Sequence, residues 1–202
     1  DAFAPMVGHS LFEAIQALNN LKHRKRKGWG LRGVKDFESV AEHAWRAGII
    51  ATMLAPEGYN KEKMLKMGVL HDISEIFDDD YTPLDGITKE EKEKRERAAV
   101  KKFTDMLSPA IGKEWKELWE EFEARKTKEA DFVKQCEILE MIFQALEYEK
   151  AGNFEKHLTE YLMKDGVRIT HPALIGLVAQ IEKEWPEKAL NEYQTPAHKY
   201  HY

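Results

Sequence analysis

Apolar residues recur three and four positions apart along almost all of this 202-residue chain, which is the spacing of one face of an α-helix. Patterns that alternate between apolar and polar residues, as in β-strands, are weak throughout. The length suits one domain rather than several. The sequence therefore predicts an all-α domain with helices over residues 9–24, 39–54, 60–72, 88–107, 128–150 and 172–185, and a short helix around 115–122.

Two of these helices are apolar on most sides, which predicts that they lie at the centre of the domain. The helix over 39–54 carries His43 on an inward face, and the helix over 60–72 ends in His71 and Asp72. Burying an imidazole and a carboxylate without partners costs several kcal/mol. A structural interpretation stays open, because a single inward histidine is more often a hydrogen-bonded core residue than a ligand.

A divalent cation would relieve the cost of burying these groups, since neutral imidazole and carboxylate both ligate such ions. Neighbouring side chains on a helix diverge by about 100°, so an ion bound by both His71 and Asp72 must sit beside the helix. Other helices must supply further ligands, and His43 with a carboxylate from farther along the chain are the natural candidates. Nitrogen and oxygen ligands of this kind suit Mn²⁺, Fe²⁺, Co²⁺ or Zn²⁺ better than Ca²⁺.

The overall composition narrows the class of partner. A net charge of −5 argues against a nucleic-acid polymer, and the basic run from Lys22 to Lys27 is more often a solvated helix end. Because Cys136 is the single cysteine, no intrachain disulfide can form, which is typical of a reducing cytoplasm. No apolar run approaches the ~18 residues of a membrane span, and no signal peptide is visible. We therefore expect a cytoplasmic protein without a membrane partner.

Four separated motifs resemble, in the same order, those of the HD-domain 5′-deoxynucleotidases, which are metal-dependent phosphohydrolases. The first motif is Gly28-Trp29, Arg32, Val34-Lys35, Glu38-Ser39-Val40 and His43; the second is His71-Asp72 with Glu75, Asp80 and Pro83; the others are Lys89-Glu90-Glu91-Lys92 and Phe132-Val133-Lys134-Gln135. The resemblance covers roughly residues 18–150.

This resemblance implies a single HD-domain helical bundle, which in the family is often dimeric. We expect residues 1–155 to form the HD-domain helical core with a short N-terminal extension. Residues 156–202 would form a C-terminal helical extension and a polar tail packed on the same domain. The family's substrates are deoxyribonucleoside 5′-monophosphates, so the expected partners are a small-molecule nucleotide and a second copy of the chain.

The resemblance also implies roles for matching residues. His43, His71 and Asp72 would bind the metal, Glu75 would position or deprotonate the attacking water, and Asp80 would act near the leaving group. Cations near the first motif are candidates to hold the phosphate, and an aromatic ring there is a candidate to contact the sugar and base: Lys27, Arg32, Lys35 and Trp29. For the tryptophan, a position in the core is the alternative.

Two residues depart from the family's pattern. Glu137 stands where the family has an aspartate as its fourth ligand, and Asp79 stands where it has a glycine. Spacing alone makes Glu137 a solvated surface residue, because it lies off the apolar stripe of its helix, whereas the resemblance makes it the fourth ligand. The expected cofactor is one divalent ion of Mn, Co, Fe, Zn or Mg.

Three functions remain open at this point. The first is metal-dependent release of phosphate from (deoxy)ribonucleoside 5′-monophosphates by attack of a metal-activated water. The second is an HD enzyme that cleaves a nucleoside triphosphate or another small phosphoester. The third is a weakly active nucleotide-binding HD protein, which the departures at Glu137 and Asp79 motivate.

Overall fold

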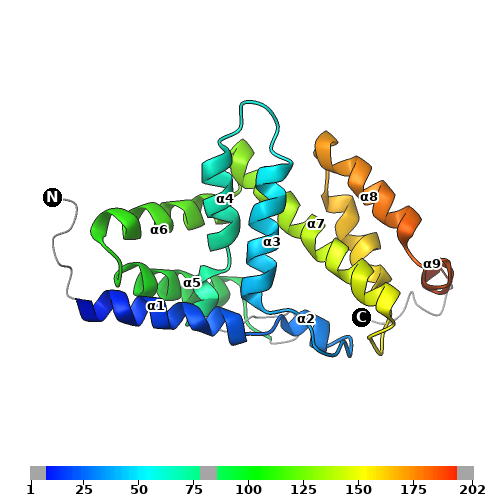
Figure 1. Ribbon diagram of the computed structural model, residues 1–202, viewed down its shortest axis with the longest axis horizontal. Helices are drawn as coiled ribbons and strands as arrows, with labels where there is room; N and C mark the ends of the chain where they lie inside the picture. The colour runs from blue at the N-terminus through cyan, green and yellow to red at the C-terminus, as the bar shows by residue number, and fades with distance from the viewer. Residues whose placement is uncertain (1–7, 78–85, 195–202) are drawn as a thin grey trace.

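The computed structural model describes residues 8–77 and 86–194, and these residues form helices joined by short loops, without a named strand. In Figure 1, α3, α4 and α7 cross the middle of the molecule, with α1, α5 and α6 on one side and α8 and α9 on the other. The all-α prediction is confirmed. The helices are α1 (Gly8–His23), α2 (Lys27–Gly30), α3 (Val40–Met53), α4 (Lys61–Leu70), α5 (Lys89–Thr104), α6 (Pro109–Ala124), α7 (Lys128–Ala151), α8 (Pro172–Glu184) and α9 (Glu187–Gln194).

Side-chain caps fix where the central helices begin. The hydroxyl of Ser39 accepts a hydrogen bond from the backbone N–H of Glu42 (3.2 Å), and the Glu42 carboxylate accepts one from the backbone N–H of Ser39 (2.6 Å). This reciprocal pair satisfies two donors that a helix start leaves without partners. Asn60 caps α4 and Thr127 caps α7 in the simpler one-bond manner.

The two helices that carry the histidines approach each other very closely. A β-carbon added to Gly68 of α4 would lie 2.6 Å from the Cα of Gly48 in α3, which is too close for any side chain. Glycine at both positions therefore lets the two backbones touch. As a result, the middle of α3 and the end of α4 lie side by side.

The long helix α7 is enclosed by other elements along most of its length. It packs against α3, α4 and α6 on one side and against α8 and the short π-helix Tyr161–Asp165 on the other. Its buried residues consequently lie on all faces and include glutamate and glutamine as well as apolar side chains. No helix in the described ranges combines the length and apolarity that crossing a membrane requires.

The C-terminal segment packs on the helical core. Trp185, which follows α8, is buried, and its indole N–H donates to the hydroxyl of Thr159 (3.1 Å). In α9, Ala189 is also buried. The division at residue 155 stays a prediction about domain organisation, and the last part of the predicted polar tail, residues 195–202, lies outside the described residues.

Candidate metal centre

His43 lies one turn into α3 and has 0% of its surface exposed. Its Nδ1 is in hydrogen-bond contact with the carboxylate of Glu140 on α7. Its Nε2 points the other way, 3.9 Å from Oδ2 of Asp72 and 3.9 Å from Oε1 of Glu137. This buried nitrogen makes no hydrogen bond to any described residue. A buried polar atom without a partner is rare and calls for an explanation such as a bound ion.

His71 stands at the C-terminal end of α4, where its Nδ1 donates to the backbone carbonyl of Gly68 (2.7 Å). A carbonyl only accepts, so the hydrogen is assigned to Nδ1, and the lone pair of the neutral ring is on Nε2. That Nε2 lies 3.1 Å from Oδ2 of Asp72. The rings of His71 and His43 are 5.2 Å apart between centroids. Both histidines thus direct an Nε2 atom toward the same carboxylate.

Glu137 of α7 completes the group, with 12% of its side chain exposed. Its Oε1 faces the histidines, and its Oε2 lies 3.1 Å from the ammonium of Lys134, one turn earlier on the same helix. That ammonium also sits 4.9 Å from the ring centre of Phe122. The surface position that spacing alone indicated for Glu137 is therefore wrong. Because other helices surround α7, the face of this helix that lies away from its apolar stripe is covered as well.

The surroundings of His43 and Glu137 favour the forms of these side chains that ligate a metal. Burial lowers the pKa of His43 well below its ordinary value, and Arg26 adds to this, so the ring is neutral at pH 7. Burial alone would raise the pKa of Glu137, but Lys134 and the two histidines outweigh it and lower the pKa to about 2.

Asp72 and His71 shift each other's pKa in opposite directions. Burial opposes ionisation of Asp72, yet His71 and Arg26 hold the pKa of its carboxyl far below its usual range. Burial alone would lower the pKa of His71, but Asp72 and Glu137 raise it above its ordinary value. The carboxylates therefore favour a positive charge between the two rings, and either a proton or a metal ion supplies it.

The donor set fits a divalent transition metal. Ligand atoms of His43, His71 and Glu137 all lie within 4.8 Å of one another, and Asp72 borders both rings. Neutral imidazole nitrogen with carboxylate oxygen suits Mn²⁺, Fe²⁺, Co²⁺ and Zn²⁺. The structure therefore brings together the four residues that the sequence nominated as ligands.

A second group of possible ligands shares His43 but fits a cation less well. It consists of Glu38, His43 and Glu140. Here the histidine offers Nδ1, which already contacts Glu140, and the guanidinium of Arg46 donates to the same carboxylate through Nε (2.7 Å). This guanidinium already supplies positive charge beside the carboxylate, so the side of His43 that faces Glu137 is the better candidate centre.

The structure describes one of the two predicted catalytic carboxylates, Glu75. Glu75 lies in a 3₁₀ turn, Ile73–Ile76, that directly follows Asp72, and its backbone N–H donates to the carbonyl of Asp72 (3.0 Å). Glu75 is buried, and it follows the candidate ligand Asp72 by three residues in the sequence. Asp80 lies outside the described residues.

The predicted substrate-binding residues of the first motif mostly contact other parts of the fold. Trp29 is 2% exposed, its indole N–H donates to Glu38 (2.9 Å), and its ring packs against Tyr148 and Tyr161. It therefore has almost no free surface for a base, in keeping with the alternative position in the core.

The cations of the same motif differ in their surroundings. Arg32 forms an ion pair with Glu160 of the C-terminal segment. The backbone of Lys35 exchanges hydrogen bonds with the side chain of Asn153, while its own side chain is exposed. Lys27 is exposed at the start of α2. The structure does not gather these three cations around the histidines.

Three residues that the sequence analysis did not nominate border the centre. Arg26 places Nη1 3.4 Å from Oδ2 of Asp72, Lys134 holds Glu137, and Glu140 contacts His43. Arg26 was hidden in a basic run that resembled a solvated helix end. The other two, Lys134 and Glu140, lie on the helix predicted over residues 128–150, where Glu137 was the only nominated residue.

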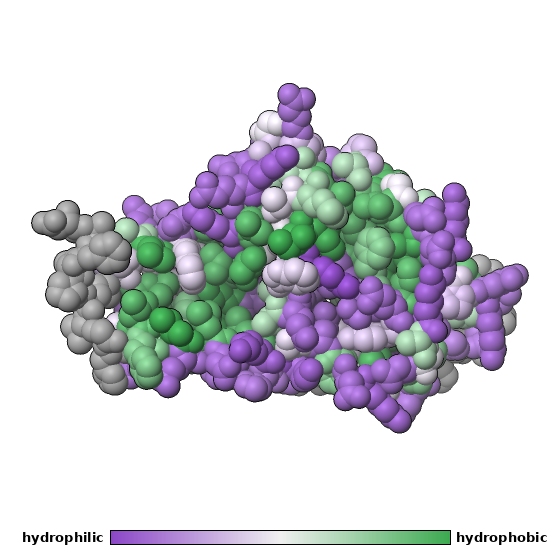
Figure 2. Space-filling model, in the orientation of Figure 1, coloured by the Kyte–Doolittle hydropathy of each residue, from purple (hydrophilic) through white to green (hydrophobic). Residues whose placement is uncertain are grey.

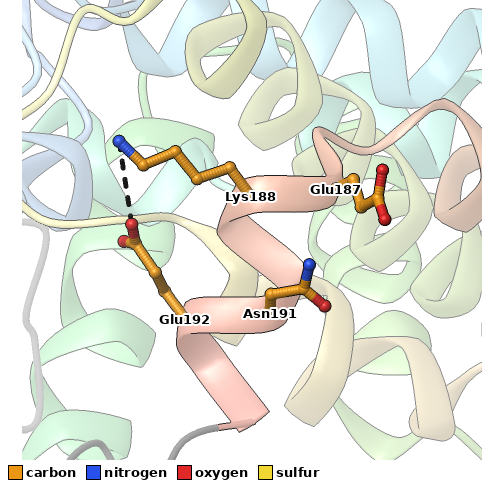
Figure 3. Close-up of a pocket in the computed structure, with 4 residues that line it drawn as sticks. All are labelled: Glu187, Lys188, Asn191 and Glu192. Atoms are coloured by element: carbon orange, nitrogen blue, oxygen red, sulfur yellow. Dashed lines mark ion pairs between the residues drawn. The ribbon is translucent and has the colours of Figure 1, made fainter.

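A hollow on the outer surface of α9 has no connection with this centre. It is lined by four polar residues of that one helix, Glu187, Lys188, Asn191 and Glu192 (Figure 3). The only ion pair among them joins Lys188 and Glu192 (3.8 Å). An open hollow on a single helix does not form the enclosed, convergent site that a small molecule needs.

Comparison with known proteins agrees with this geometry. The HD domain family matches residues 18–174. The 5′-deoxynucleotidase HDDC2 of Homo sapiens is 36% identical over 184 residues, which cover 90% of each chain. The 5′-deoxynucleotidase hdd1 of Schizosaccharomyces pombe is 36% identical over 179 residues, covering 87% of this chain and 90% of the relative.

Solved structures show the same arrangement of helices. The PH0347 protein from Pyrococcus horikoshii OT3 superposes with a TM-score of 0.72 at 28% identity, covering 86% of this chain and 99% of that one. A protein from Magnetospirillum magnetotacticum MS-1 described as a predicted metal-dependent phosphohydrolase superposes with a TM-score of 0.71 at 27% identity, covering 93% of this chain and 98% of that one. This chain therefore belongs to the HD domain family.

Proposed function

We propose that the chain is a metal-dependent phosphohydrolase that releases phosphate from (deoxy)ribonucleoside 5′-monophosphates. The observation that carries this proposal is the convergence of His43, His71, Asp72 and Glu137 from three helices and the turn after α4. The names of the relatives in man and fission yeast, both 5′-deoxynucleotidases, support the choice of substrate.

The four ligand side chains would hold one divalent ion, of which Mn²⁺, Co²⁺, Fe²⁺ and Zn²⁺ suit the imidazole nitrogens better than Mg²⁺ does. Such an ion supplies Lewis acidity toward the phosphoryl group and lowers the pKa of water. Glu75, in the turn after Asp72, is the proposed base that takes a proton from the attacking water. The water oxygen bonds to phosphorus, the bond from phosphorus to the 5′-oxygen breaks, and the departing oxygen gains a proton.

Positive side chains would stabilise the charge on the phosphate in this reaction. Arg26 is the best-supported candidate, because its guanidinium already reaches the edge of the centre at Asp72. Lys27 follows it on an exposed position at the start of α2. Asp80 retains its proposed role near the leaving group. We assign Trp29 and Arg32 instead to support of the loop that carries these cations, because both are engaged by the C-terminal half of the chain.

The test is an assay of phosphate release from dAMP, dGMP, dCMP and TMP with Mn²⁺, Co²⁺ or Mg²⁺. We expect release from the native chain, and a loss of about 10²–10⁴-fold in kcat for Glu75→Gln, which removes the base. Glu187→Gln on the outer face of α9 is the matched control and should leave the rate unchanged. No release by native protein that holds one metal ion per chain would overturn the proposal. Pyrophosphate or triphosphate release from dATP would favour a triphosphate hydrolase instead.

We also propose that the chain forms a homodimer through an apolar face on α1 and α3. Large apolar side chains are exposed there, and Figure 2 shows such residues gathered over these helices. Exposed apolar patches of this extent usually mark an interaction surface. The residues of this apolar face are Leu11, Phe12, Ile15, Trp45, Ile49 and Met53.

We place the protein in the cytoplasm. The support is its single cysteine, Cys136, which is buried and has no partner for an intrachain disulfide. Burial raises the pKa of this thiol to about 12, so it is not a reactive thiolate at neutral pH. Fractionation of cells against a cytoplasmic marker checks this assignment, and enrichment in a secreted fraction would contradict it.

A further inference from the structure

A buried carboxylate next to the candidate metal centre has no role in the reaction described above. Glu140 lies one turn after Glu137 on α7 and is 0% exposed. Its Oε2 is in hydrogen-bond contact with Nδ1 of His43, on the side of the ring opposite the candidate ligands. An ionisable side chain so deeply buried is costly unless its partners compensate for lost hydration.

The contact dictates which nitrogen of His43 carries the hydrogen. Burial raises the pKa of Glu140, but the adjacent Arg46 guanidinium opposes this effect and favours the ionised carboxylate. An ionised carboxylate only accepts hydrogen bonds, so Nδ1 is the donor and Nε2 of the neutral ring has the lone pair. That lone pair is directed toward Asp72 and Glu137, as metal ligation requires. The opposite tautomer would place a hydrogen where the ion binds and would leave Glu140 facing a second acceptor.

Glu140 is itself held in place by a guanidinium. Arg46, one turn after His43 on α3, donates from Nε to Oε1 of Glu140 (2.7 Å). Its Nη2 donates to Gln144 (2.8 Å) and approaches the backbone carbonyl of Glu140 (3.4 Å). The two oxygens of Glu140 are thus divided between Arg46 and His43, which fixes the plane of the carboxylate.

We propose that Glu140 is a positioning residue, anchored by Arg46, that locks His43 in its Nδ1–H tautomer and orients Nε2 toward the metal. Carboxylates that accept from the far nitrogen of a metal-bound histidine commonly raise metal affinity by about 10–100-fold. The inference rests on the proposed metal-dependent function, and it adds a residue outside the ligand set to that centre.

The test compares Glu140→Gln with Glu147→Gln in the full chain. Glu147 is on the same helix and contacts the same arginine (3.5 Å), but it is mostly exposed and does not touch His43, which makes it a matched control. Two quantities are measured: Mn²⁺ affinity by calorimetry, and the tautomer of His43 by nitrogen NMR of the metal-free protein with labelled histidine. Because the second readout needs neither metal nor activity, it reports directly on the contact.

For Glu140→Gln we expect Mn²⁺ affinity to fall by about 10-fold or more, together with a mixed tautomer signal for His43. Phosphate release should recover at saturating Mn²⁺, and Glu147→Gln should match the native chain in both readouts. If Glu140→Gln fails to fold, Arg46→Gln, at a half-buried position, replaces it, and a smaller change in the same direction is expected.

Two outcomes would overturn the inference in distinguishable ways. Native affinity and a native tautomer in both Glu140→Gln and Arg46→Gln would remove the positioning role while leaving the proposed function intact. Absence of Mn²⁺ binding by the native chain would remove both proposals, since there would be no ion toward which His43 could be oriented.

Discussion

At the scale of single residues, Glu137 shows how a longer carboxylate can reach a candidate ligand position. One oxygen faces the histidines and the other is held by Lys134 (3.1 Å). The extra methylene lets the same side chain reach both neighbours. Lys134 therefore acts on the centre through Glu137, by fixing its position and by keeping it ionised.

Replacing Lys134 by methionine keeps an unbranched side chain over the ring of Phe122 and removes the positive charge. We expect Mn²⁺ affinity to fall by about 10-fold or more, because Glu137 loses the partner that orients it. Calorimetric titration of the metal-free protein measures this. The control is Lys150→Met, on the same helix as Lys134. This substitution breaks an exposed ion pair with Glu184 of α8 (2.9 Å). Equal affinities in the two variants would refute the role of Lys134.

Residue types and spacing predicted His43, His71 and Asp72 as candidate ligands, and the family resemblance added Glu137, but neither predicted the surroundings of these residues well. His43, His71 and Asp72 stood out because polar groups within apolar helices are expensive. Trp29 and Arg32 stood out for their chemistry, yet one is buried in the core and the other pairs with Glu160. Contacts with a segment more than a hundred residues away decide these roles, and no local pattern encodes such contacts.

At the scale of helices, the crossing of α3 and α4 determines how close the two histidines come. Gly68→Ala would force these helices apart, since the new methyl group would meet the backbone of Gly48 at 2.6 Å. We expect a loss of about 1–3 kcal/mol in the free energy of unfolding, with weaker Mn²⁺ binding. Urea denaturation monitored by circular dichroism measures the first effect.

Gly176→Ala is the control for this prediction. This glycine lies in α8 at an exposed position, and an added β-carbon would meet nothing within 4 Å. Alanine is the better helix former, so the variant should be more stable by about 0.5–1 kcal/mol. Similar effects from the two substitutions would contradict the account of close helix contact.

The start of α3 gives a prediction that depends on pH. Hydrogen bonds from the backbone N–H and the hydroxyl of Ser39 lower the pKa of Glu42, so its stabilising effect is present above the ordinary glutamate range and lost as the pH falls. Ser39→Ala should cost about 1 kcal/mol at pH 7. The difference from the native chain should narrow toward pH 3. Denaturant midpoints at both pH values check this, and a difference that widens at low pH would exclude it.

Helical periodicity predicted most of the helices but misjudged which faces are covered. In α7, Phe132, Cys136 and Leu139 of the predicted apolar stripe are buried, and so are residues off that stripe, such as Gln135 and Glu140, because neighbours enclose the helix on several sides. In α3 the opposite holds: Trp45 and Met53 belong to its apolar pattern but are exposed. Periodicity shows where apolar side chains lie along a helix, but it does not show whether other parts of the same chain cover them.

At the scale of the whole molecule, the apolar face on α1 and α3 leads to a prediction about assembly. Trp45 belongs to this face and is 62% exposed. If a second copy covers it, Trp45→Lys should convert a dimer into a monomer, because burying an unpaired ammonium is costly. Light scattering coupled to size-exclusion chromatography measures the mass. Val167→Lys, at an exposed apolar residue of the C-terminal segment, should remain dimeric.

A native chain that is monomeric at tens of micromolar would contradict the proposed homodimer.

The C-terminal segment shows what a family resemblance leaves out at this scale. The resemblance ends near residue 150, yet Trp29 packs on Tyr161 and Arg32 pairs with Glu160. The segment thus braces the loop that leads to α3.

The central claim is that His43, His71, Asp72 and Glu137 hold one divalent ion. Anomalous diffraction from a crystal of the native chain grown with Mn²⁺ tests it most directly. We predict one peak per chain, bonded to Nε2 of both histidines and to both carboxylates. A peak on the opposite side of His43, between its Nδ1 and Glu140, or no peak in a preparation that releases phosphate, would contradict the account.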